Sequence, residues 1–158
     1  MATDKKRKTV GFVCTGNTCR SPMAEALFNK LTDTDGEQGN WFAKSAGLAA
    51  EKGAPATDNA IAVMEKRGIE LGDHRATQLS RTFIEDAELV ITMNETQRDL
   101  LHLYFPDSKN KIFTLAEYVE KDVDIPDPFG GDMKFYEKTA AMFDELIPLL
   151  VKKLDKVN

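Results

Sequence analysis

A cysteine and an arginine separated by five residues stand near the start of the chain, in the segment Cys14-Thr15-Gly16-Asn17-Thr18-Cys19-Arg20-Ser21. A curled loop of this kind turns several backbone N–H groups towards one point, where they can hold an anion. Gly16 lets the backbone turn without a Cβ clash, and Asn17 tolerates a left-handed conformation. Arg20 offers a planar fork to two phosphate oxygens, and the positive surroundings favour the thiolate of Cys14, to which Ser21 can donate a hydrogen bond. The segment therefore predicts a nucleophilic cysteine that faces a bound phosphoryl group.

The spacing alone is weak evidence, because a lone cysteine after a strand is more often a small buried hydrophobic residue. The segment lacks the terminal Gly-Lys-Ser/Thr of a nucleotide-binding P-loop, and Gly16 is its only glycine, so it is not a GxGxxG motif either. Cys19 can pack in the core, or it can capture an oxidised Cys14 as a disulfide. The sequence leaves both interpretations of Cys19 open.

Phosphoryl transfer to sulfur also needs an acid that protonates the leaving group and then a base that activates water. Asp127 stands between Pro126 and Pro128, which restrict its backbone and make a stiff presenting loop. Asp124 and Asp132 remain alternatives on local chemistry, because aspartate in a Pro/Gly-rich loop is commonly a turn former.

The two histidines are weaker candidates for acid or base. His102 falls within an expected helix and is assigned a structural or solvent-facing role. His74 lies in a polar stretch, where it is expected to support a loop by hydrogen bonding. The chain offers almost no ligands for a zinc ion, because it has two histidines and two cysteines and lacks a CxxC or HExxH pattern. We expect neither a metal nor a cofactor.

These residues need strands and helices that bring them together. The apolar runs and helix signals predict strands at 8–13, 41–46, 88–93 and 111–114, and helices at 22–31, 58–67, 81–87, 95–104 and 134–154. Ser21 is expected to be the N-cap of the first helix, with Pro22 at its first position. Strands that alternate with helices predict an α/β fold with a parallel sheet covered on both faces, in which ligands sit at the carboxyl ends of the strands.

Size and composition fit this fold. The 158 residues are 42% hydrophobic and 30% charged, which is typical of one globular domain. We expect residues 1–7 to form a basic disordered tail and residues 8–158 a single domain. The net charge of −5 argues against binding to nucleic acid or to an anionic membrane. No run of 18 apolar residues is present, and two cysteines are too few for a disulfide framework, so we expect a cytoplasmic protein that acts as a monomer.

The segments VCTGNTCRSPMAEA and DPFGG together resemble the low-molecular-weight protein-tyrosine phosphatase family, and the likeness extends from residue 8 onward. The resemblance implies a flavodoxin-like three-layer fold with a four-stranded parallel sheet and helices on both faces. It also implies a cysteinyl-phosphate intermediate that forms without a metal.

The resemblance assigns roles to individual residues. It implies that Cys14 is the nucleophile, Arg20 the phosphate-binding arginine and Asp127 the general acid. It implies that Asn17 organises the loop and is buttressed by His74. The residues expected to bind phosphate are Thr15, Gly16, Asn17, Thr18, Cys19, Arg20 and Ser21, of which Cys19 and Ser21 also have supporting roles.

Two departures from the tyrosine-specific members bear on the substrate. Thr18 stands where those members carry a bulky aliphatic residue, and Phe129, Gly130 and Gly131 follow the Asp-Pro pair where tyrosines are common. Both features resemble the bacterial branch that removes phosphate from protein arginine. The smaller, hydroxyl-bearing Thr18 leaves space and polarity for a guanidinium group. We therefore predict a protein-arginine phosphatase whose partners are phosphorylated proteins.

Other functions are compatible with parts of this pattern. A protein-tyrosine phosphatase is the nearest alternative, with Thr18 as a tolerated substitution. Arsenate reductases share the fold and loop but relay oxidation to further cysteines, which this chain lacks. A non-catalytic phosphate-binding or redox-sensing module is the alternative from another class. The presence of Cys14, Arg20 and Asp127 together argues against that module.

Overall fold

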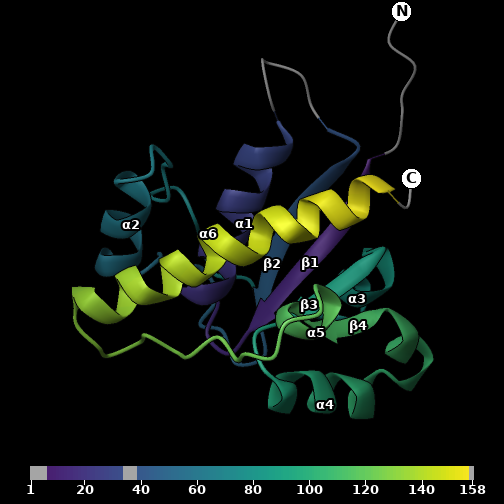
Figure 1. Ribbon diagram of the computed structural model, residues 1–158. Coiled ribbons are helices and arrows are strands. Elements are labelled where there is room, and N and C mark those ends of the chain that lie inside the picture. The colour runs from purple at the N-terminus through teal and green to yellow at the C-terminus, as the bar shows by residue number, and fades with distance from the viewer. Residues whose placement is uncertain (1–6, 34–38, 157–158) are drawn as a thin grey trace, which may run out of the picture.

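The computed structural model describes residues 7–33 and 39–156 (Figure 1). Its elements follow in the order β1 (Lys8–Cys14), α1 (Arg20–Thr32), β2 (Trp41–Gly47), α2 (Asp58–Glu65), α3 (Arg81–Asp86), β3 (Leu89–Thr92), α4 (Glu95–Tyr104), η1 (Pro106–Lys111), β4 (Ile112–Thr114), α5 (Leu115–Tyr118) and α6 (Met133–Lys156). Residues 1–6 of the expected basic tail lie outside this part of the chain.

The four strands form one parallel sheet in the order β2-β1-β3-β4, which confirms the predicted α/β class. Cys14 pairs with Gly47 at the carboxyl ends of β1 and β2, so the loops that follow both strands leave from the same edge of the sheet. This is the edge at which ligands bind in open parallel sheets.

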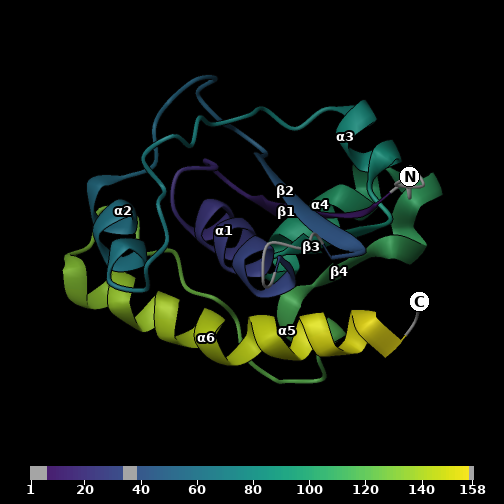
Figure 2. The ribbon, with the colours of Figure 1, turned by 90° about the horizontal axis from the view of Figure 1, so that it is seen from above.

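Helices cover both faces of the sheet, as the view from above shows (Figure 2). Val10 and Phe12 of β1 point into the larger core cluster, which includes residues of α1, α2 and α6. Val13 belongs to the smaller cluster on the other face, where Ile84 of α3 and Leu101 of α4 are buried. The alternation along β1 shows why this strand is apolar on both faces, as expected for a central parallel strand.

Three of the predicted helices begin with a side chain that caps the first turn. The side chains of Thr57, Ser80 and Asn94 accept hydrogen bonds from backbone N–H groups in the first turns of α2, α3 and α4. The prediction for α1 is wrong, because Cys19 occupies its N-cap position without a side-chain hydrogen bond. The hydroxyl of Ser21 instead interacts with the loop that precedes the helix.

Two short elements were missed by the sequence reasoning. The 3₁₀ helix η1 and the four-residue α5 flank β4 and are too short to show an apolar periodicity. The last helix, α6, begins at Met133, ends at Lys156 and continues through Pro148. It packs against α1, α2 and α5 and contributes side chains to the larger core cluster.

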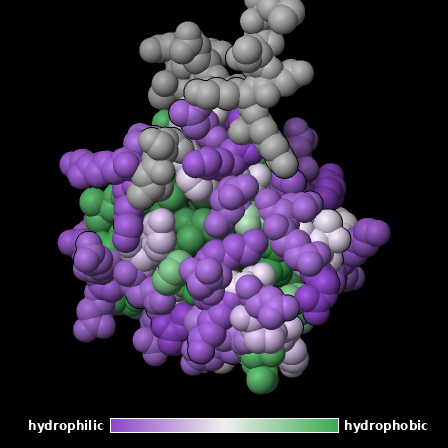
Figure 3. Space-filling model, turned by 90° about the vertical axis from the view of Figure 1, so that its right-hand side faces the viewer, coloured by the Kyte–Doolittle hydropathy of each residue, from purple (hydrophilic) through white to green (hydrophobic). Residues whose placement is uncertain are grey.

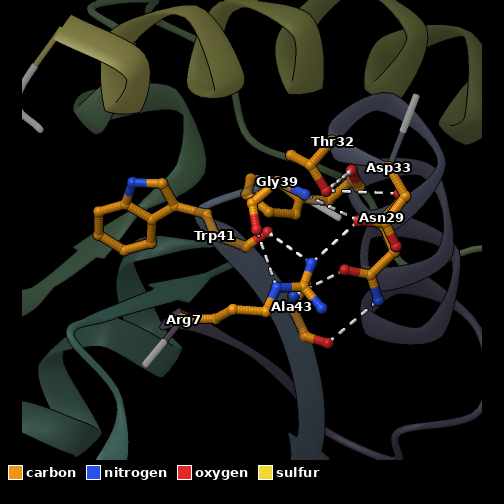
Figure 4. A network of polar contacts seen from close by, with 8 residues as sticks. Arg7, Asn29, Thr32, Asp33, Gly39, Trp41 and Ala43 are labelled. Carbon is orange, nitrogen blue, oxygen red and sulfur yellow. Dashed lines mark hydrogen bonds and ion pairs between the residues drawn. The ribbon is translucent and has the colours of Figure 1, made fainter. Parts of the chain in front are cut away.

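Polar contacts hold the start of β1 to its neighbours (Figure 4). Arg7 Nη2 donates a hydrogen bond of 2.9 Å to Asp33 Oδ1, and Arg7 Nε donates one of 2.9 Å to the carbonyl of Gly39. The side chain of Asn29 pairs with both backbone groups of Ala43, at 2.8 and 3.2 Å. These contacts fasten the end of α1 to β2, at the edge of the sheet opposite the loop after β1.

The face shown in Figure 3 carries mainly hydrophilic side chains, with apolar residues in small separate patches. Among residues 7–33 and 39–156, no helix has the length and apolar character needed to span a membrane.

Candidate active site

A cavity of about 170 Å³ opens at the carboxyl end of β1. Its walls come from the loop between β1 and α1 and from the loop that precedes α6. The lining residues are Cys14, Thr15, Gly16, Thr18, Cys19, Arg20, Asp127 and Phe129. The fold therefore brings the cysteine, the arginine and one of the three candidate aspartates to one place, although Asp127 follows Arg20 by more than a hundred residues in the sequence.

The sulfur of Cys14 lies at the start of the loop, with the residue only 2% exposed. Ser21 Oγ is 2.9 Å from the sulfur, and the backbone N–H of Asn17 donates to it at 3.3 Å. Hydrogen bonds of this kind stabilise a thiolate more than a thiol, because the charged form is the stronger acceptor. These two contacts are compatible with the nucleophilic role predicted for Cys14.

Asn17 is completely buried, and its side chain contacts the start of α1, β2 and the segment before α3. Its backbone φ is +56°, a left-handed conformation that asparagine adopts more readily than most residues. Its Nδ2 donates to Ser21 Oγ at 2.8 Å and to Ser45 Oγ at 2.9 Å, and its Oδ1 accepts from the backbone N–H of Thr77 at 2.8 Å. His74 Nε2 makes a hydrogen bond of 2.7 Å with the backbone carbonyl of Asn17.

Close packing of β2 against the loop explains a glycine at the end of that strand. A Cβ atom at Gly47 would lie 2.7 Å from the carbonyl oxygen of Thr15 and 3.0 Å from the backbone nitrogen of Asn17. Both distances are shorter than ordinary van der Waals contacts, so a side chain at this position would displace the loop.

Two residues of the support beneath the loop were missed by the sequence reasoning. Ser45 Oγ donates a hydrogen bond of 2.5 Å to Glu25 Oε1 and receives one from Asn17. Burial raises the pKa of the Glu25 carboxyl above its ordinary value, against the opposing effects of the Ser45 hydrogen bond and the nearby His74. The sequence held two signals for this support: Ser45 is a polar residue within a predicted strand, and Glu25 is a charged residue among the apolar residues of the first helix.

Arg20 is 3% exposed and lines the cavity together with Cys14. Its Nη1 donates a hydrogen bond of 3.0 Å to the carbonyl of Ile125, and its Nη2 lies 3.5 Å from Asp127 Oδ2. Its Nε is buried and has no hydrogen-bond partner among the described residues. An unpaired buried N–H next to the cavity is a donor that an anion could satisfy.

The structure distinguishes among the three candidate aspartates. Asp127 lines the cavity with its side chain about half exposed, and its Oδ1 accepts a hydrogen bond of 3.1 Å from the backbone N–H of Phe129. Asp132 accepts a hydrogen bond from the backbone N–H of Lys134 at the start of α6, which is the turn-forming role. Asp124 is exposed and does not line the cavity.

The second cysteine differs chemically from the first. Burial, together with the negative charges of Asp127 and Cys14, raises the pKa of the Cys19 thiol from 9.0 to about 11. Cys19 is therefore a protonated thiol at neutral pH, and its sulfur lies 3.8 Å from Asp127 Oδ1. Both cysteines are free in this structure.

The remaining predicted residues have clear places. Thr18 and the exposed ring of Phe129 border the cavity, where they can contact the group that carries the phosphate. His102 lies away from it and makes a hydrogen bond of 2.9 Å with the carbonyl of Ile112, a structural role. Within the described ranges, no group of three or more His, Cys, Asp or Glu side chains could hold a metal ion.

The cavity combines a sulfur with hydrogen-bond donors, a buried guanidinium and an accessible carboxyl group. The sulfur can attack an electrophile, the guanidinium can hold its negative oxygens, and the carboxyl can supply and recover a proton. This combination suits displacement at a phosphorus atom bound in the loop.

Comparisons with known proteins agree with this chemistry. A family model described as low molecular weight phosphotyrosine protein phosphatase matches residues 9–158. The protein-arginine-phosphatase of Bacillus subtilis (strain 168) is 39% identical over 146 residues, which cover 92% of this chain and 95% of that protein.

Two solved structures show the same fold. A low molecular weight protein tyrosine phosphatase from T. tengcongensis is 42% identical, with a TM-score of 0.88 over 92% of this chain and 99% of that chain. A mutant of the YwlE arginine phosphatase with a phosphorylated active-site serine is 38% identical, with a TM-score of 0.88 over 94% of this chain and 96% of that chain.

Proposed function

The chain belongs to the low molecular weight phosphotyrosine protein phosphatase family, and we propose that it hydrolyses phosphoarginine on proteins through a cysteinyl-phosphate intermediate. The observation that carries the proposal is the single cavity that joins Cys14, Arg20 and Asp127. The likeness to a protein-arginine-phosphatase over nearly the whole chain, with Thr18 at the cavity, favours phosphoarginine as the substrate.

In the first step, the thiolate of Cys14 attacks phosphorus and the P–N bond breaks. Arg20 and the backbone N–H groups of the loop hold the phosphoryl oxygens, whose charge is greatest in the transition state. Asp127 gives its proton to the departing nitrogen, so that arginine leaves as its guanidinium cation rather than as the free guanidine base. The products of this step are the dephosphorylated arginine and a phosphate bound covalently to sulfur.

In the second step, water attacks the phosphorus of the cysteinyl phosphate. Asp127, now a carboxylate, accepts a proton from the water as the S–P bond breaks. Inorganic phosphate leaves, and the Cys14 thiolate is restored. Ser21, 2.9 Å from the sulfur, stabilises that leaving thiolate.

Phosphate release from a phosphoarginine peptide tests the proposal. Cys14→Ser is expected to abolish turnover, and substantial residual activity would contradict the mechanism. Asp127→Asn is expected to lower kcat by at least about a hundredfold while the affinity for inorganic phosphate changes little. Asp124→Asn and Asp132→Asn are the matched controls, because they make the same change in the same loop outside the cavity.

Phosphotyrosine is the second candidate substrate. The exposed aromatic ring of Phe129 at the cavity could pack against a phenyl ring, and several relatives are named as tyrosine phosphatases. The nucleophile, arginine and acid would keep their roles, since only the leaving group differs.

The same proposal gives Cys19 a protective role. Because Cys14 and Cys19 line one cavity, an oxidised Cys14 could form a disulfide with Cys19 instead of oxidising further. Peroxide treatment followed by mass spectrometry should then detect a disulfide between them, and its absence would limit Cys19 to packing.

We also propose that the enzyme is cytoplasmic, which is consistent with its two free thiols. We propose in addition that it works as a monomer, and sedimentation would test its oligomeric state.

A further inference from the structure

Gln97, in the first turn of α4, joins the loop after β1 to the end of β3. It is 3% exposed, and its Nε2 donates a hydrogen bond of 3.2 Å to Thr15 Oγ1. Its Oε1 accepts one of 2.9 Å from the backbone N–H of Met93. Asn94 fixes this turn, because its side chain accepts from the backbone N–H of Gln97 at 2.9 Å. An apolar side chain of equal length would fill the same space but leave the buried N–H of Met93 without a partner, so the two polar contacts do more than fill space.

The backbone of Met93 also holds the segment that presents Asp127. The carbonyl of Met93 accepts a hydrogen bond of 3.3 Å from the backbone N–H of Ile125. The carbonyl of Ile125 in turn accepts one of 3.0 Å from Arg20 Nη1. Ile125 is 1% exposed, so these bonds are shielded from water, and it precedes Asp127 by two residues.

These contacts connect both ends of the segment from Cys14 to Arg20, here called the phosphate loop, through residues outside it. The connection consists of Thr15, Gln97, Met93, Ile125 and Arg20, in that order. We propose that Gln97 is a positioning residue for the reaction, which holds the phosphate loop and the aspartate-bearing segment in register. The inference rests on the proposed function, because that function supplies the roles of the loop and the aspartate.

Loss of the connection should misplace the general acid more than the phosphate cradle. The cradle keeps the hydrogen bonds of Asn17 to Ser21 and Ser45. The carboxyl of Asp127 is held more loosely, at 3.5 Å from Arg20 Nη2, so its place depends on its own backbone. A misplacement of about 1 Å can cost roughly a hundredfold in rate, and we expect a smaller shift to cost roughly tenfold.

The test compares kcat/KM of the Gln97→Met variant on phenyl phosphate and p-nitrophenyl phosphate. Phenolate leaves poorly without a proton, whereas p-nitrophenolate leaves readily, so the first substrate depends more on the general acid. We expect a loss of about tenfold with phenyl phosphate and less than about threefold with p-nitrophenyl phosphate. Gln97→Asn, whose shorter side chain cannot span both partners, should show the same difference in a milder form and remains informative if Gln97→Met does not fold.

Gln78→Met is the matched control. Gln78 also bridges two backbone groups near the loop, because it accepts from the N–H of Ala50 and donates to the carbonyl of Leu48, both at 2.9 Å. It has no part in the connection to residues 125–127, so its variant should show no dependence on the leaving group.

Equal losses on both substrates in the Gln97 variants would indicate a general effect on folding and overturn the inference, as would unchanged rates. The proposed substrate is tested separately, by phosphate release from a phosphoarginine peptide with the native protein. A native protein that turns over neither aryl phosphate overturns the inference alone, whereas one that releases no phosphate from the phosphoarginine peptide overturns the proposed function.

Discussion

Replacing Asn17 with alanine would remove the central support of the phosphate loop. Three hydrogen bonds of its side chain are lost, to Ser21, Ser45 and Thr77, and each contributes about 1 kcal/mol. Alanine must also adopt the φ of +56°, which costs about 1 kcal/mol more. We therefore expect the free energy of unfolding to fall by about 4 kcal/mol, which lowers the melting temperature by roughly 12 °C in a domain of this size.

Thermal and urea unfolding monitored by circular dichroism measure this loss. Asn110→Ala is the matched control, because Asn110 is exposed and its replacement should stay within about 0.5 kcal/mol of the native value. Asn17→Gly loses the same hydrogen bonds but accepts the left-handed backbone, so it should be more stable than Asn17→Ala by about 1 kcal/mol. If the free energy of unfolding of Asn17→Ala lies within about 1 kcal/mol of that of Asn110→Ala, the hydrogen bonds of Asn17 do not support the loop as described.

Three further predictions concern single groups of the site. In a Cys14→Ser background, burial and the charge of Asp127 still raise the pKa of the Cys19 thiol, so Cys19 should react with iodoacetamide at pH 8 at least about tenfold more slowly than in unfolded protein; mass spectrometry measures the rate. Burial raises the pKa of Glu25 above its ordinary value of 4.5, so the folded protein loses stability as the pH rises from 4.5 through the pKa of the folded state. Glutamine at this position can still accept a hydrogen bond from Ser45 but does not ionise. Glu25→Gln should therefore gain stability relative to the native protein between pH 4 and pH 8, as measured by urea titrations. Ser21→Ala should lower kcat by roughly tenfold, since it removes a hydrogen bond to the sulfur, and an unchanged kcat would exclude that role.

The fold could be predicted largely from the sequence because its signals are local. Apolar runs mark the four strands, and capping residues such as Thr57 and Asn94 mark the helix starts. The exceptions are places where a side chain has a competing partner. Ser21 resembles an N-cap, but its hydroxyl interacts with Asn17 and with the Cys14 sulfur, and the helix begins two residues earlier than expected.

The site could be predicted only where its residues are consecutive or match a known motif. The segment from Cys14 to Ser21 supplies most of the residues that line the cavity, and their chemistry can be inferred from residue types at short spacing. Ser45 and Gln97 contact this loop from β2 and α4, which no local pattern shows. Local chemistry leaves Asp124 and Asp132 as alternatives to Asp127, and only the resemblance to a known family singles out Asp127, which lines the cavity in the structure.

The most direct test of the account compares kcat/KM on matched phosphoarginine and phosphotyrosine peptides, with Cys14→Ser as the blank. The account predicts a preference for phosphoarginine that is reduced or reversed in Thr18→Ile, because the larger apolar side chain removes space and polarity beside the guanidinium. A native preference for phosphotyrosine, unchanged by Thr18→Ile, would contradict the proposed substrate and make Thr18 an incidental feature of the cavity.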